Sequence, residues 1–121
     1  LPIYFPKWMG ENEAPFFTPD TPEATRAWIR GMMLGVPLPV ALACRKTISF
    51  ADLRAAAKGI DRPTLVVHGD QDASAPLALT GAKTASLIGG SKFVVYEGAP
   101  HALPLTHSAR LLADLLAFID A

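Results

Sequence analysis

The hydrophobic pattern of the chain changes character near residue 60. Upstream, apolar residues recur at helical spacing, and those that predict a helix over about 22–33 are Ala24, Trp28 and Met32. Thr21 is placed to cap this helix and Pro22 to occupy its first turn. Two shorter helices are predicted, over about 39–46 and about 50–59. The upstream part is therefore predicted to be helical.

Downstream, apolar runs end at glycines. Residues 60–70 and 91–101 each carry a β-branched run that stops at a glycine, which is typical of strands buried on both faces. Between them, 76–88 has helical spacing, interrupted by Gly81. The final stretch, 106–121, places on one helical face Leu111, Leu112, Leu115, Leu116 and Ile119. Two strands joined through a helix form a right-handed crossover and lie parallel.

Composition narrows the class of protein. With 121 residues, half of them apolar, and zero formal net charge, the chain predicts one folded domain at most. The Lys and Arg residues are scattered, so neither nucleic acid nor a membrane is expected as partner. Cys44 is the single cysteine and is predicted to be a buried thiol. No signal peptide or spanning segment is recognised, so a cytoplasmic setting is expected.

The start of the chain, LPIYFPKWMG, has no initiator methionine and is typical of the interior of a longer protein, or of a processed one. Residues 1–20 are rich in proline and aromatic residues and predict loop and short helix packed on another part of the molecule.

Candidate chemistry lies where the two predicted strands end. The first ends in HGDQD and the second in EGAPH. Neighbouring parallel strands lie about 5 Å apart, so an aspartate of one loop can reach His101 of the other. Such a pair orients an imidazole for nucleophilic hydrolysis. By residue type alone, Asp70 and Asp72 would sooner be plain turn residues, and it is the presence of matching loops at the ends of both strands that favours the catalytic interpretation.

At these segments the sequence resembles the α/β-hydrolases. PTLVVHGDQDASAP (63–76) is similar to their acid loop, and FVVYEGAPHALPLTH (93–107) to the segment of their catalytic histidine. The GAPH…TH wording, the final LLADLLAFI and residues 28–54 resemble the cofactor-free haloperoxidase and arylesterase group. The resemblance covers about residues 25–121.

The resemblance implies that Asp72 is the acid and His101 the base of a catalytic triad. Ala102 departs from the glycine that usually follows the histidine. Asp70 is then a turn residue, and His68 a core or loop-tethering histidine. Two further predictions are that His107 caps or packs at the last helix, and that Trp28 is either core or a wall of the substrate pocket. No metal site and no cofactor are implied.

The implied fold is α/β, the C-terminal part of an α/β-hydrolase with parallel strands and covering helices. Residues 1–59 would be a helical cap remnant and connection, and residues 60–121 the C-terminal βαβα part of an incomplete core domain. No serine stands in a G-x-S-x-G setting, so the nucleophile and the oxyanion hole are expected from outside this chain. The expected partners are the N-terminal half of the same hydrolase, or a second copy joined through an exposed strand edge.

The expected activity is serine-type hydrolysis of carboxylic esters or similar small acyl substrates, with perhydrolysis as a side reaction implied by the resemblance. Two alternatives stay open. A C–C hydrolase or a dehalogenase would use the same fold with a different missing nucleophile. A non-catalytic, truncated hydrolase-like module would serve binding or assembly instead.

Overall fold

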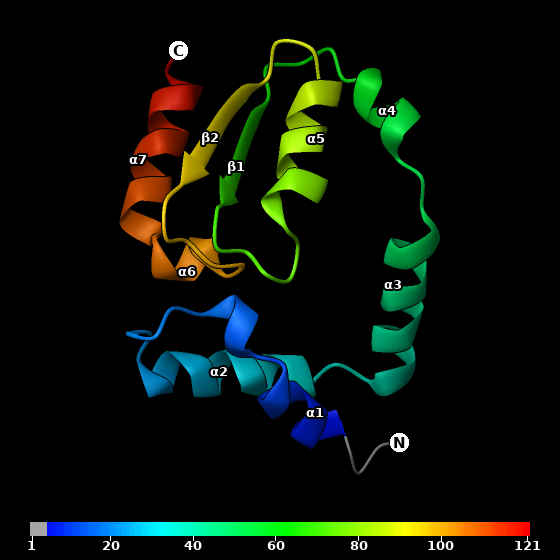
Figure 1. The fold of residues 1–121 in the computed structure, drawn as a ribbon, viewed down its shortest axis with the longest axis vertical. Helices are drawn as coiled ribbons and strands as arrows, with labels where there is room; N and C mark the ends of the chain where they lie inside the picture. Colours follow the sequence, from blue (N-terminus) through cyan, green and yellow to red (C-terminus); the bar gives the residue numbers. More distant parts are fainter. Residues whose placement is uncertain (1–4) are drawn as a thin grey trace.

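The computed structural model describes residues 5–121. Helices surround a small sheet, and a second helical group lies beneath it (Figure 1). In chain order the elements are α1 Phe5–Glu11, η1 Ala14–Phe16, α2 Glu23–Leu34, α3 Leu38–Phe50, α4 Arg54–Lys58, β1 Leu65–Gly69, η2 Leu77–Leu79, α5 Gly81–Leu87, β2 Lys92–Tyr96, α6 Leu103–Thr106 and α7 Ser108–Ile119.

The sheet consists of β1 and β2, which pair in parallel from Leu65 opposite Lys92 to Gly69 opposite Tyr96. In Figure 1, α5 lies beside β1 and α7 beside β2. The predicted order of strand, helix, strand, helix after residue 60 is confirmed, and so is the parallel pairing. Both strands therefore end at the same edge of the sheet, facing the helical group of α1 and α2.

The core lies where β2 meets α6 and α7. Tyr96, Ala99 and Leu103 are buried, and the partly buried side chains packed around them are Val67, Val94 and Leu111. The hydroxyl of Tyr96 donates a hydrogen bond to Asp114 Oδ2 at 2.5 Å, and the guanidinium of Arg110 lies 3.8 Å from the centre of the tyrosine ring. The same tyrosine thus joins the end of β2 to α7.

Burial of the strands on both faces was predicted, and this is wrong for β2. Phe93 is 37% and Val95 38% exposed, whereas Tyr96 is fully buried. α5 has seven residues and lies beside β1, so it leaves the face of β2 that carries Phe93 and Val95 partly uncovered. Cys44 was predicted to be buried and is exposed, because most of α3 is exposed along its length.

Helix boundaries differ from the predicted ones where the sequence lacks a strong stop. α3 runs to Phe50 rather than ending near 46, since no Gly or Pro follows Pro39 until Gly59. α4 is correspondingly short. α2 begins at Glu23 without a side-chain cap, because the Thr21 hydroxyl instead accepts a hydrogen bond from the Thr18 N–H. α1 and η1 match the short helix predicted within 1–20, of which residues 1–4 lie outside the described part.

The last predicted helix is divided into α6 and α7 at His107, whose φ of −127° is not helical. His107 packs against Tyr96, with 6.1 Å between ring centres, and its Nδ1 lies 2.8 Å from the hydroxyl oxygen of Thr106. It stands at the N-cap position of α7 but its side chain makes no capping hydrogen bond there, so of the two predicted alternatives, capping or packing, the structure shows packing.

Within residues 5–121, no helix on its own has the length and apolarity to cross a membrane. The pair α2 and α3 passes together, by length and composition only, and is bent by 93°.

Candidate active site

The two loops that follow the strands are joined by backbone hydrogen bonds. The N–H of Asp70 donates to the carbonyl of Tyr96 at 3.1 Å, and the N–H of Gln71 donates to the carbonyl of Ala99 at 3.1 Å. Asp70 Oδ1 accepts the N–H of Gly98 at 2.8 Å. Asp70 is therefore the turn residue it was predicted to be, and it ties the first loop to the second.

Gly69 allows this close contact between the loops. A Cβ at Gly69 would lie 2.1 Å from the carbonyl oxygen of Ala99, which is far inside van der Waals contact. The glycine that ends β1 thus lets the backbone after β2 approach, and the first loop then turns Asp72 toward the second loop.

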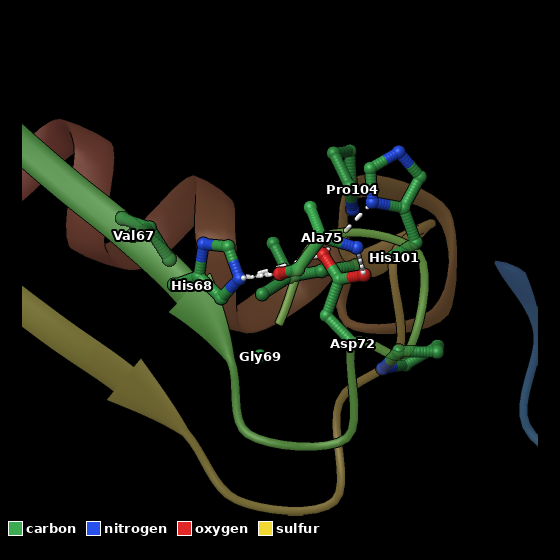
Figure 2. A pocket seen from close by; sticks show the side chains of 9 residues that line it. Val67, His68, Gly69, Asp72, Ala75, His101 and Pro104 are labelled. Carbon is green, nitrogen blue, oxygen red and sulfur yellow. Dashed lines mark hydrogen bonds and ion pairs between the residues drawn. The ribbon is translucent and has the colours of Figure 1, made fainter. Parts of the chain in front are cut away.

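Asp72 and His101 meet at this edge of the sheet, 29 residues apart in sequence. His101 Nδ1 lies 2.8 Å from Asp72 Oδ2, and Asp72 Oδ1 accepts the N–H of Ala75 at 2.7 Å. The side chain of Asp72 is 6% exposed and that of His101 is 39% exposed. In Figure 2 the other ring nitrogen of His101 points away from the carboxylate. A carboxylate that accepts from Nδ1–H leaves Nε2 free to accept a proton.

Burial would raise the pKa of Asp72, but three favourable contacts outweigh it. The Ala75 N–H, the hydrogen bond with His101 and the field of the His101 and His68 imidazoles hold the pKa of the carboxyl below its ordinary value. Asp72 is therefore ionised at neutral pH, which is the state that accepts a hydrogen bond from an imidazole.

A segment from the N-terminal part of the chain supports the loop that carries His101. The N–H groups of His101 and Ala102 donate to the carbonyls of Pro15 and Phe16 at 3.1 and 3.0 Å. The Phe16 ring lies edge-on to the imidazole, with 5.0 Å between ring centres. Ala102 has φ −82°, a conformation open to any residue, so alanine in place of glycine does not strain the loop.

Residues 13–18, which we call the strap, are held in place by side chains of α2. Arg30 donates two hydrogen bonds to the Glu13 carboxylate, at 2.8 and 2.7 Å. Arg26 donates to the carbonyl of Thr18 at 2.7 Å, and its guanidinium lies 5.2 Å from the centre of the Phe17 ring. No motif in the sequence pointed to the strap, and its hydrogen bonds with the loop of His101 use only backbone groups.

A cavity of about 230 Å³ opens beside the Asp72–His101 pair (Figure 2). It is lined by Val67, His68, Gly69, Asp72, Ala75, Pro100, His101, Leu103 and Pro104. None of these residues is a serine, threonine or cysteine, so the lining provides no hydroxyl or thiol nucleophile. His68 lies within hydrogen-bond distance of the Ala75 carbonyl, at 2.8 Å, which confirms the loop-tethering role predicted for it.

Trp28 lies elsewhere. It is on α2, 58% exposed, and does not line the cavity, so the structure does not bring it together with Asp72 and His101. Its role in substrate binding stays a prediction. Among residues 5–121, no group of three or more His, Cys, Asp or Glu side chains is arranged to hold a metal ion.

No family model matches the chain. Individual relatives do. The chain is 39% identical over 71 residues to the bifunctional esterase/perhydrolase DCH of Acinetobacter calcoaceticus, a match that covers 59% of this chain and 26% of that protein. It is 37% identical over 94 residues to a non-heme chloroperoxidase of Streptomyces lividans, covering 78% of this chain and 33% of that protein. The chain thus spans about a third or less of the length of these relatives.

Solved structures agree at the level of the fold. The bromoperoxidase from Bacillus anthracis superposes with a TM-score of 0.90 at 29% sequence identity, covering 96% of this chain and 44% of that one. An esterase from Exiguobacterium antarcticum superposes with a TM-score of 0.88 at 21% identity, covering 96% and 43%. In sequence and in fold, the chain is a homologue of the C-terminal part of the non-heme haloperoxidases and esterases of the α/β-hydrolase family.

Proposed function

We propose that these 121 residues supply the acid and base of a Ser-His-Asp triad that hydrolyses carboxylic esters or similar small acyl substrates. The observation that carries the proposal is the 2.8 Å contact between His101 Nδ1 and Asp72 Oδ2, with the carboxylate buried and the other ring nitrogen directed away from it. The nucleophilic serine would come from residues outside this chain, because none of the described residues that line the cavity beside the pair carries a hydroxyl group.

In this mechanism His101 Nε2 takes the proton of the serine as its oxygen attacks the acyl carbonyl. The imidazolium that forms is stabilised by the ionised Asp72, and it then gives the proton to the departing alcohol. In the second half His101 takes a proton from water, whose oxygen attacks the acyl-enzyme, and the serine leaves with that proton. Asp72 stays ionised throughout, in keeping with its lowered pKa.

Perhydrolysis would follow from the same acyl-enzyme, with hydrogen peroxide in place of water and a peracid as the product. The names of two relatives, an esterase/perhydrolase and a non-heme chloroperoxidase, support this as a side reaction. We propose no metal or organic cofactor for it.

The test is hydrolysis of p-nitrophenyl acetate by the chain alone and together with any polypeptide that co-purifies with it from its natural source. The complete assembly should be active, and Asp72→Asn should lower kcat on the order of 10⁴-fold because the imidazole loses its correct tautomer. His101→Ala should abolish hydrolysis. Asp70→Asn is the matched control, two residues away, since an amide oxygen still accepts the Gly98 N–H. Activity that survives His101→Ala would refute the mechanism.

The second candidate is a non-catalytic module that kept the fold for binding or assembly. The observation in its favour is again the cavity lining without a nucleophile. It predicts no ester hydrolysis by the chain with or without co-purifying polypeptides.

A further alternative is another enzyme of the same fold. A C–C hydrolase would hydrolyse a diketone with a serine nucleophile, and a dehalogenase would hydrolyse a haloalkane with an aspartate nucleophile. The nucleophile in the co-purifying partner therefore identifies which of the two applies.

A further inference from the structure

His68 is a partly buried titratable side chain that the proposed reaction does not use. Its side chain is 13% exposed and stands at the end of β1. Nε2 lies 2.8 Å from the carbonyl oxygen of Ala75 and 3.4 Å from Asp72 Oδ2, the same oxygen that contacts His101. Because a carbonyl only accepts, Nε2 carries the proton. One N–H thus faces both the backbone of the acid loop and the carboxylate (Figure 2).

Hydrogen bonds also connect the loop after β1, which carries Asp72, back to His68. The N–H of Ala75 donates to Asp72 Oδ1 at 2.7 Å, and the carbonyl of Ala75 accepts from His68. The Thr80 hydroxyl donates to the same carbonyl at 3.0 Å. Asp72 is therefore linked back to β1 through Ala75 and His68, in addition to the covalent path along the loop.

Gly81 lies next to the imidazole, near its Nδ1. A Cβ at Gly81 would lie 2.5 Å from His68 Nδ1 and 2.7 Å from Cγ, closer than non-bonded atoms approach. Gly81 is buried and is the first residue of α5. The glycine that interrupts the predicted helix therefore leaves the space that the ring of His68 occupies.

We propose that His68 is a positioning residue: held against Gly81, it keeps Asp72 in the place where the carboxylate meets His101. The proposal rests on the proposed function, in which Asp72 and His101 are acid and base. It assigns to His68 and Gly81 a part in catalysis that acts through Asp72.

Variants of both residues in the assembled hydrolase test this. His68→Leu keeps an apolar side chain but removes the N–H, and it should lower kcat roughly 10- to 100-fold, the scale of an ångström-sized misplacement. KM should stay within about twofold, because the variant acts on the placement of Asp72, and a positioning effect appears in kcat. His68→Gln, which keeps an N–H donor, should recover most of the loss.

Gly81→Ala should reproduce the loss in kcat although alanine favours the helix, so the effect cannot come from reduced helix stability. The double variant His68→Leu/Gly81→Ala should be no slower than either single variant, because both act through one contact. Gly89→Ala is the matched control: it follows α5, has no atom within 4 Å of its would-be Cβ, and should behave as the parent protein.

A readout that does not depend on activity is the NMR signal of the His101 Nδ1–H, which a carboxylate acceptor moves downfield. This signal should move upfield and exchange faster in His68→Leu and Gly81→Ala, but not in Gly89→Ala. An unchanged signal together with kcat within about twofold of the parent overturns the proposal. Activity that survives His101→Ala refutes the proposed function instead, while the Nδ1–H signal still decides whether His68 positions Asp72.

Discussion

At the scale of single residues, Tyr96 shows how one side chain can give the fold a pH dependence. Burial, the hydrogen bond to Asp114 and the charge of that carboxylate raise the pKa of the Tyr96 phenol to about 12. A pKa above the unfolded value, ~10, means that the neutral phenol stabilises the fold. The contribution is complete below pH ~10 and is lost as the pH rises toward 12.

Tyr96→Phe should therefore lower the free energy of unfolding at pH 7 by about 1 kcal/mol, the scale of one hydrogen bond. It should also remove part of the fall in stability between pH 10 and 12. Urea unfolding across this range measures both effects. Asp114→Asn is the companion variant, which keeps a hydrogen-bond acceptor but removes the negative charge. It should narrow the pH range over which the free energy of unfolding falls, because the charge of Asp114 helps to raise the pKa of Tyr96. If the free energy of unfolding of Tyr96→Phe fell between pH 10 and 12 as steeply as that of the parent, Tyr96 would not be the source of this pH dependence.

The sequence places Asp70, Asp72 and His101 in loops that follow predicted strands, which is a local signal, and the resemblance to the α/β-hydrolases implies which of them are acid and base. Parallel pairing then brings the two strand ends together, as the register shows. The link from Gly81 to His68 could not be predicted in the same way. An isolated glycine in a helical pattern is compatible with a helix start, a break or a close contact, and only the packing decides which applies.

At the scale of elements, the strap links the helices of the N-terminal part to the loop of His101. Arg30→Ala removes both hydrogen bonds to Glu13, so the strap should loosen. Amide hydrogen exchange should then become faster at His101 and Ala102, whose N–H groups donate to the strap.

Arg54→Ala is the matched control for this experiment. Arg54 makes a two-bond pair with Asp52 of the same geometry, but that pair is local and exposed. Its loss should leave exchange at His101 and Ala102 unchanged. Equal exchange at these two amides in Arg30→Ala and in the parent would show that the Arg30–Glu13 pair does not hold the strap in place.

Elements with strong periodicity, such as α2 and the two strands, were predictable because their signals are local. The length of α3 and the exposure of Cys44 were not, because both depend on what packs beside that helix. The pairing of the strap with residues 101–102 has no sequence signal, since any residue except proline can supply a backbone N–H.

At the scale of the whole molecule, exposed large apolar side chains outnumber the buried apolar residues among residues 5–121. In that range the buried ones are Met9, Phe17, Ile88, Tyr96, Ala99 and Leu103. On α7 alone the exposed ones are Leu112, Leu115, Leu116 and Ile119, and α3 exposes Val40, Leu42, Ile48 and Phe50. Clusters of exposed apolar side chains on one helix face are typical of surfaces that contact another polypeptide. This supports the expected association with the other half of a hydrolase or with a second copy.

We therefore predict that the chain purified alone associates with itself. Light scattering after size exclusion should give a mass above the 12.9 kDa of one copy. Leu112→Lys/Leu116→Lys, which places two charges on the exposed face of α7, should lower the mass toward that of a single copy. Ala117→Lys, at another exposed position of the same helix, should leave it unchanged. A folded monomer of the unmodified chain would instead mean that its small core suffices by itself and that its apolar faces need no partner.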